Sequence, residues 1–215
     1  MRRASDGTTN AGRAAPVALQ ALALAAMLLL CGAGTEAAAA CGGVKHAPAV
    51  KRGGDGRAPL VVGDSVLLGA VRQVAAAGFE VDTRGCRQMR EGLHVISARK
   101  RAKTLPRLVV IALGTNGSIQ MSDIRAAMSI VGRDRVLGLV TPRELGGGSG
   151  SDARVVRAAG RRYPDRVRVL DWVRDSAGRR GWFAGDGIHL GSSGAAGLAR
   201  LLRGALPFAT APLCP

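Results

Sequence analysis

Short apolar runs recur from Pro59 onward, and each is followed by a stretch with helical spacing of its apolar residues. The runs predict five strands, at residues 59–63, 79–83, 107–113, 135–140 and 166–172. The intervening stretches predict helices at residues 66–78, 88–102, 123–132, 152–163 and 192–206. This alternation predicts a three-layer α/β/α sandwich with a five-stranded parallel sheet. A glycine-rich stretch at residues 144–152 is expected to form a mobile loop.

The N-terminal part of the chain has a different pattern. An apolar run at residues 14–34 follows a basic flank and precedes an alanine tract. This order favours a secretory signal peptide, and the alternative is a retained membrane anchor. We therefore expect residues 1–40 to be a signal or anchor, residues 41–58 a flexible linker and residues 59–215 an exported domain. Membrane association would then depend on the N-terminus.

Cysteines give a further expectation about this boundary. Cys41 follows three alanines and precedes two glycines, which resembles a bacterial lipoprotein cleavage box. Lipidation of Cys41 would leave Cys86 and Cys214 free to pair in an oxidising compartment. The alternative is that one of these residues stays a free thiol.

The formal net charge of +16 attracts polyanions. Aromatic residues make up only 3% of the chain, and no zinc-finger or RNA-recognition signature is present, so no nucleic-acid partner is expected. An acidic envelope polymer or a lipid surface fits an exported chain better. The alternative is a solvated arginine-rich face that follows from composition alone.

Candidate chemistry lies after the predicted strands, at the carboxyl edge of the sheet where ligands bind in such folds. Ser65 in "GDSVL" stands at a strand-to-helix turn, where it is either a nucleophile or a helix cap. Asn116 in "LGTNG" either forms a tight turn or donates a hydrogen bond to a developing oxyanion. Gly85 in "TRGCRQ" could bring a backbone N–H to the same point.

The last loop supplies an acid–base pair. "DGIHL" is a turn signal, but it also places Asp186 three residues before His189. A short loop of this kind can set the carboxylate against Nδ1 of the imidazole and leave Nε2 facing outward, as a general base for serine requires. His46 in the linker and His94 in a predicted helix are weaker candidates.

The ordered blocks "GDSV", "GTNG" and "DGIHL" resemble those of the SGNH (GDSL-like) hydrolase family, over Pro59 to about Leu206. The resemblance implies a flavodoxin-like fold, with Ser65 as nucleophile, His189 as base and Asp186 as the residue that orients it. It also implies an oxyanion hole formed by Ser65, Gly85 and Asn116. The stretch "VDTRGCRQM" looks more like the variant found in SGNH domains of envelope O-acyltransferases.

These residues predict acyl transfer through serine, with no metal or cofactor needed. The expected substrate is an acyl ester, with an acetyl or other short chain, on an envelope glycan or a lipid. Trp182 and Phe183 either line the substrate site or pack on the core. The expected activity is that of an esterase; an O-acyltransferase and a non-catalytic envelope-binding module are the alternatives. The oligomeric state cannot be predicted from the sequence.

Overall fold

The computed structural model describes residues 41, 43–50, 56–145 and 148–210. The chain divides into two compact units, residues 1–40 and 41–215, and all the described residues belong to the second. The predicted signal or anchor lies outside them. Within the part of the chain that the structure describes, no helix is long and apolar enough to cross a membrane.

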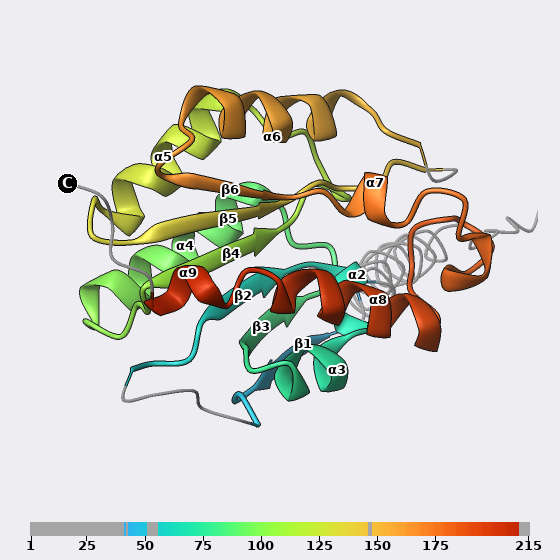
Figure 1. Ribbon diagram of the computed structural model, residues 1–215, viewed down its shortest axis with the longest axis horizontal. Helices are drawn as coiled ribbons and strands as arrows, with labels where there is room; N and C mark the ends of the chain where they lie inside the picture. Colours follow the sequence, from blue (N-terminus) through green and yellow to red (C-terminus); the bar gives the residue numbers. More distant parts are fainter. Residues whose placement is uncertain (1–40, 42, 51–55, 146–147, 211–215) are drawn as a thin grey trace, which may run out of the picture. The chain divides into compact units, whose positions relative to one another are not determined.

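The described residues form a six-stranded sheet with the order β1-β3-β2-β4-β5-β6 (Figure 1). The strands are β1 (Val44–Ala47), β2 (Leu60–Gly63), β3 (Glu80–Arg84), β4 (Leu108–Ala112), β5 (Val136–Val140) and β6 (Val167–Leu170). Strands β2 to β6 are mutually parallel and match the five predicted strands. Their carboxyl ends therefore meet at one edge of the sheet.

The sixth strand corrects the prediction of a linker over residues 41–58. Val44–Ala47 pairs antiparallel with β3, with Val44 opposite Arg84 and Ala47 opposite Val81. The segment "VKHA" has no apolar run that would predict a strand. It becomes an edge strand by pairing its backbone with the free backbone groups of β3. His46 in this strand has a side chain that is 62% exposed and contacts Asp82 at 3.2 Å.

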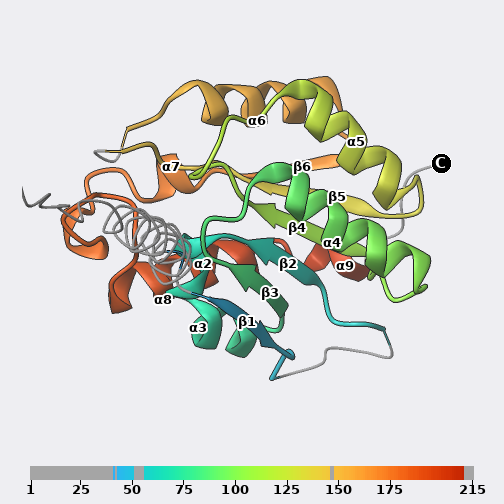
Figure 2. The same cartoon turned by 180° about the vertical axis from the view of Figure 1, so that it is seen from behind.

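Helices cover both faces of the sheet, which confirms the α/β/α sandwich. The helices are α2 (Ser65–Leu68), α3 (Val71–Ala76), α4 (Met89–Arg101), α5 (Met121–Val131), α6 (Ser151–Arg162), α7 (Trp172–Asp175), α8 (Ser192–Arg203) and α9 (Pro207–Thr210), with a 3-10 turn η1 (Arg180–Trp182). Figure 1 shows α3 and α8 on one side of the sheet, and Figure 2 shows α4 and α5 on the other.

Alternate residues of the strands contribute to two apolar cores, one on each face of the sheet. Val61 and Val110 pack with α3 and α8, whereas Val62 and Ile111 pack with α4, α5 and α6. The alternation follows from the two-residue period of a strand, and both faces are apolar because both are covered. The central strands are consequently buried on both faces, and they hold the residues at their ends in fixed positions.

Two of the helices differ in their boundaries from the prediction. The helix predicted for residues 66–78 is interrupted between α2 and α3, where a Cβ on Gly69 would come within 3.4 Å of the Leu190 carbonyl. Helix α6 begins at Ser151, inside the predicted glycine-rich loop. Residues 146–147 of that loop are not among those described.

The predicted cysteine chemistry is wrong at Cys41. Cys41 and Cys86 form a disulfide, so neither is available for the predicted Cys86–Cys214 pair, and a thioether lipid on Cys41 is excluded in this form. Cys214 lies outside the described residues. The bond joins the segment before β1 to the loop after β3, which the antiparallel course of β1 brings together. The sequence separation of 45 residues gave no sign of this contact.

Candidate active site

Ser65, His189 and Asp186 lie in hydrogen-bonding contact at the carboxyl edge of the sheet. Ser65 opens α2 directly after β2, and the other two residues lie in the loop before α8. His189 Nε2 is 3.0 Å from Ser65 Oγ, and His189 Nδ1 is 2.5 Å from Asp186 Oδ2. The structure thus brings together three residues that the sequence placed up to 124 positions apart.

Asp186 is held as an acceptor. Its Oδ1 accepts hydrogen bonds from the backbone N–H groups of Ile188 at 2.9 Å and His189 at 3.0 Å. The hydrogen bond to His189, followed by that from Ile188 N–H, lowers the pKa of Asp186 to about 2. An ionised carboxylate only accepts, so the proton of a neutral His189 lies on Nδ1 and the lone pair of Nε2 faces Ser65.

Backbone hydrogen bonds join the two ends of the loop that carries Asp186 and His189. Phe183 and Leu190 form an isolated antiparallel bridge, and Ala184 N–H donates to the His189 carbonyl at 2.8 Å. Gly187 has a φ of 71°, and its N–H donates to Ala184. Glycine tolerates this left-handed conformation, which turns the chain between Asp186 and His189. This tight turn therefore accounts for the spacing of three residues between Asp186 and His189.

Asp64 connects the nucleophile turn to the loop after β4. It caps α2 by accepting Val66 N–H at 3.0 Å, and its other oxygen accepts the Thr115 hydroxyl at 2.8 Å. The carboxyl is 1% exposed, and burial raises its pKa against the lowering effect of these hydrogen bonds. The helix cap is thus Asp64 and not Ser65, and the Ser65 hydroxyl contacts His189 instead.

Two hydrogen-bond donors beside Ser65 have no partner among the residues that the structure describes. The Asn116 Nδ2 atom is buried and makes no hydrogen bond. The Ser65 backbone N–H, at the first position of α2, also has no acceptor there. Buried donors are nearly always satisfied in proteins, so an unsatisfied amide next to a serine–histidine pair fits a site that receives a transient acceptor.

Comparisons with known proteins agree with this geometry. No family model matches the sequence. The chain is 28% identical over 149 residues to O-acetyltransferase OatA of Staphylococcus aureus, covering 67% of this chain and 24% of that protein. It is 27% identical over 138 residues to peptidoglycan O-acetyltransferase OatA of Listeria monocytogenes, covering 63% and 22% respectively. The chain therefore spans about a quarter of the length of these curated relatives.

Solved structures show the same fold. The C-terminal catalytic domain of Streptococcus pneumoniae peptidoglycan O-acetyltransferase A superposes with a TM-score of 0.63 at 24% identity, covering 73% of this chain and 96% of that domain. A lipase/acylhydrolase from Enterococcus faecalis gives a TM-score of 0.51 at 18% identity, covering 69% and 95%. The chain thus shares its fold with the catalytic domain of an O-acetyltransferase and with a lipase/acylhydrolase.

The expected oxyanion role of Gly85 is corrected by its backbone contacts. Its N–H donates to the Gly43 carbonyl at 3.0 Å and so continues the ladder between β1 and β3. A Cβ at this position would lie 1.0 Å from the Cys41 carbonyl oxygen. Gly85 is needed for the close approach of two backbones beside the disulfide, and its N–H is not free to serve an oxyanion.

The aromatic residues before the acid–base loop pack on the core. The Trp182 ring stacks on Trp172 with centroids 5.7 Å apart, and a Cβ at Gly197 would lie 2.4 Å from the Trp182 ring. Phe183 meets Trp172 edge to face at 5.9 Å. Phe183 also lines a cleft of about 620 Å³ beside the Asp186 loop, whereas Trp182 is not among the residues that line it.

Arg143 is a residue of the candidate site that the sequence analysis missed. Its Nε donates to the Gly187 carbonyl at 2.9 Å, and one terminal nitrogen donates to Ser176 Oγ at 2.8 Å. Its guanidinium carbon lies 4.1 Å from the centroid of the Phe183 ring. Burial lowers its pKa below the usual arginine value. Arg143 follows β5, so its place at a strand end was the signal that could have identified it.

Proposed function

We propose that this SGNH domain transfers a short acyl group from an ester donor to a hydroxyl of an envelope glycan, through an ester on Ser65. The single observation that carries the proposal is the continuous contact from Asp186 through His189 to Ser65 Oγ. The likeness to proteins named O-acetyltransferase, two of them by sequence, supports a glycan acceptor. The predicted export of residues 59–215 and the disulfide support an extracytoplasmic site of action.

In the first half of the reaction, Ser65 Oγ attacks the carbonyl carbon of the donor ester. His189 Nε2 accepts the hydroxyl proton as the new C–O bond forms. Asp186 holds the ring in position and stabilises the imidazolium through its 2.5 Å contact with Nδ1. Collapse of the tetrahedral intermediate expels the donor alkoxide, which takes the proton back from His189, and leaves the acyl group on Ser65.

The negative charge on the tetrahedral oxygen needs donors that are already in place. The Ser65 N–H and the Asn116 amide are candidates for this role, because neither has an acceptor among the described residues. A preorganised donor of this kind is worth about 10² to 10³ in turnover. Gly85 has no part in this step, because its N–H is bonded to Gly43.

A short acyl group fits the space beside the nucleophile. A cavity of about 30 Å³ is lined by Asp64 and Val66, the residues on either side of Ser65, and by Ile188 of the acid–base loop. Its apolar lining includes Val66, Leu113 and Ile188. A volume that small accommodates a methyl-sized group and not a long chain. This supports acetyl or a similarly short acyl group.

The second half of the reaction decides between transfer and hydrolysis. His189 removes a proton from an incoming hydroxyl, which attacks the acyl-Ser65 carbonyl and releases the serine. The hydroxyl belongs to a glycan in transfer and to water in hydrolysis. The His189 side chain is 49% exposed, so water has access, and a simple esterase is the second candidate. The complete chain of contacts from Asp186 to Ser65 disfavours a non-catalytic binding module.

The test uses hydrolysis of a short-chain nitrophenyl ester by the full chain, with Ser65→Ala and His189→Ala as matched variants. We expect the wild type to turn over and both folded variants to lose activity. Their folding is checked by thermal unfolding. A folded Ser65→Ala protein with wild-type turnover would refute the proposed nucleophile.

Addition of a glycan acceptor separates transfer from hydrolysis. With the nitrophenyl ester as donor, a transferase produces acylated glycan, detected by mass spectrometry, and releases less free acid. An esterase releases the same free acid with and without glycan. The second result would favour hydrolysis as the natural reaction.

A further inference from the structure

Three arginines line the cleft of about 620 Å³ beside the acid–base loop. Arg143, Arg179 and Arg180 form one side, and Phe183 and Ala184 contribute with them. The cleft also includes Gly185 and Gly187, the two residues that flank Asp186. The group that binds in this cleft would therefore lie against the same loop that positions His189.

Two of the guanidinium groups are fixed by contacts that leave donors unused. Arg143 donates through Nε and one terminal nitrogen, so its other terminal nitrogen has no recorded acceptor among the described residues. Arg179 donates through Nε to the Asp175 carbonyl at 3.1 Å and lies 4.4 Å from the Trp182 ring centroid. Both of its terminal nitrogens lack an acceptor in the same part of the chain. A guanidinium held in this way loses little entropy on binding an anion.

Arg180 is exposed, and within residues 41, 43–50, 56–145 and 148–210 its side chain makes no hydrogen bond or ion pair. No aspartate or glutamate lines the cleft. Glu144, next to Arg143 in sequence, is turned toward Gly150, where a Cβ would lie 1.4 Å from its carboxylate oxygen. The positive charges of the cleft are thus not neutralised from within it.

Three glycines line the cleft with the arginines, namely Gly178, Gly185 and Gly187. Gly178 and Gly185 have open space where a Cβ would be, with no atom within 4 Å. A surface without side chains admits a ring-sized group, and Phe183 offers it an apolar face. Arginine forks bind carboxylate and phosphate oxygens in pairs, which gives the cleft a preference for anionic groups.

We propose that this cleft is the acceptor subsite and that it binds a carboxylate or phosphodiester group carried on a glycan, through Arg179 and Arg180, with Arg143 as the inner donor. The proposal deepens the acyl transfer proposed above and rests on it. An anionic group bound there would hold the neighbouring sugar hydroxyls near Ser65 and His189. Recognition would then depend on charge at a defined place and not on the net charge of +16 alone.

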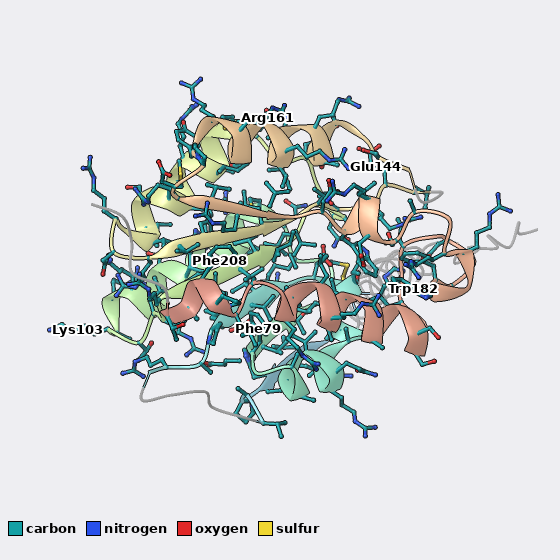
Figure 3. All side chains as sticks on the ribbon, in the orientation of Figure 1. Phe79, Lys103, Glu144, Arg161, Trp182 and Phe208 are labelled. Carbon is teal, nitrogen blue, oxygen red and sulfur yellow. A yellow bond between two sulfur atoms is a disulfide. The ribbon has the colours of Figure 1, made fainter. Side chains whose placement is uncertain are left out.

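The experiment measures binding of two probes to full-length Ser65→Ala, which cannot consume them. One probe is a carboxyl-bearing oligosaccharide, tested beside its neutral methyl-esterified twin. The other is a glycerol-phosphate polymer. Each is titrated against the parent, against Arg179→Gln/Arg180→Gln and against a control, Arg125→Gln/Arg161→Gln. The control removes the same charge from exposed residues of α5 and α6, away from the cleft, and Figure 3 shows Arg161 on α6.

We expect the cleft variant to weaken binding of the preferred anionic probe by about tenfold or more, and the control to change it less than about twofold. The stronger of the two probes identifies the anionic group. The neutral twin should bind weakly to all proteins, and binding to the parent should weaken with salt. Thermal unfolding verifies that each variant is folded.

Equal loss in the cleft variant and the control would overturn the proposal, because it would show that only net charge matters. Binding of the neutral twin as tightly as the acidic probe would also overturn it. Failure of the proposed acyl transfer has a different signature, namely no turnover of the nitrophenyl ester by the wild type, and it leaves this binding result intact. The two ideas can therefore fail separately.

Discussion

Thr115 donates its hydroxyl proton to Asp64 Oδ2 at 2.8 Å, so the loop after β4 is tied to the residue that precedes Ser65. The bond joins the elements that carry the nucleophile and Asn116. Because Asp64 is 1% exposed and its pKa is raised by burial, its carboxyl has little access to substitute partners. The Thr115 backbone N–H donates to the same oxygen at 3.4 Å, so Thr115 holds the loop that carries Asn116 against the turn that carries Ser65 through two contacts.

Thr115→Val keeps the shape of the side chain and removes the hydroxyl. We expect a loss of about 1 to 3 kcal/mol in the free energy of unfolding, because a buried carboxyl loses a partner, together with reduced ester turnover. Denaturant unfolding and nitrophenyl ester kinetics measure both effects. Thr104→Val is the control, since the Thr104 hydroxyl makes only a 3.3 Å contact with the Arg99 carbonyl. Indistinguishable unfolding of the two variants would contradict the assignment.

Asn116→Ala removes the amide that has no partner in the described residues. We expect turnover of the nitrophenyl ester to fall about 10²- to 10³-fold. The free energy of unfolding should change little, because no hydrogen bond of the described fold is lost. Asn116→Asp, which keeps the size but not the donor, should be equally impaired. Unchanged turnover in a folded Asn116→Ala protein would exclude it from the oxyanion hole.

Asp186→Asn tests the orientation of His189. The amide favours the wrong ring tautomer, so turnover should fall about 10³- to 10⁴-fold with the fold intact. The same variant tests the pKa of Asp186, which is lowered in the folded state to about 2 from 3.8. A lowered pKa contributes stability above about pH 4 that is lost as the pH falls toward 2.

The free energies of unfolding of wild type and Asp186→Asn should therefore converge between pH 5 and about pH 2. Urea unfolding across this range measures the difference between the two proteins. A difference that stays constant with pH would show that the carboxylate gains nothing from its contacts with His189 and Ile188.

Arg143→Ala tests the anchoring of the acid–base loop. The variant loses the hydrogen bonds to the Gly187 carbonyl and to Ser176, so His189 should move relative to Ser65. We expect kcat for the neutral nitrophenyl ester to fall about tenfold to a hundredfold, with KM less affected. Arg143→Lys should recover part of the loss. An exposed arginine variant, Arg125→Ala, controls for charge, and an equal kcat in both alanine variants would rule out the anchoring role.

The disulfide gives a prediction about stability. Cys41→Ser/Cys86→Ser, or reduction of the wild type, should lower the free energy of unfolding by about 2 to 4 kcal/mol, because the bond between residues 45 positions apart no longer restricts the unfolded chain. Mass spectrometry of the purified protein should show the two cysteines linked and no lipid on Cys41. A lipid-modified Cys41, or equal stability of reduced and oxidised protein, would contradict the observed pairing.

The centre of the parallel sheet could be predicted because its middle strands are apolar throughout, as residues 108–113 and 136–140 show. Ser65, Asn116, Asp186 and His189 were identifiable for the same reason, since each follows a recognisable strand or lies in a short turn. β1 could not be predicted, because "VKHA" has no periodic pattern and its strand conformation depends on pairing with β3. The same pairing decided the cysteine partners and the role of Gly85.

The roles of Arg143 and Thr115 could not be predicted from the sequence. Both lie at strand ends, but arginine and threonine are common there, and nothing in their local sequence indicates the partner. Their roles depend on Gly187 and Asp64, which are 44 and 51 positions away. Hydrogen bonds of this range arise from the tertiary fold, so only the structure could assign them.

The direction of β1 fixes where the polypeptide enters the domain. Because β1 runs antiparallel to β3, Cys41 lies at the edge of the sheet from which Ser65 emerges. Had the strand run the other way, the entry point would lie about 16 Å away, at the far end of a five-residue strand. Chemical change at this disulfide would thus act on the same rim of the sheet that carries Ser65.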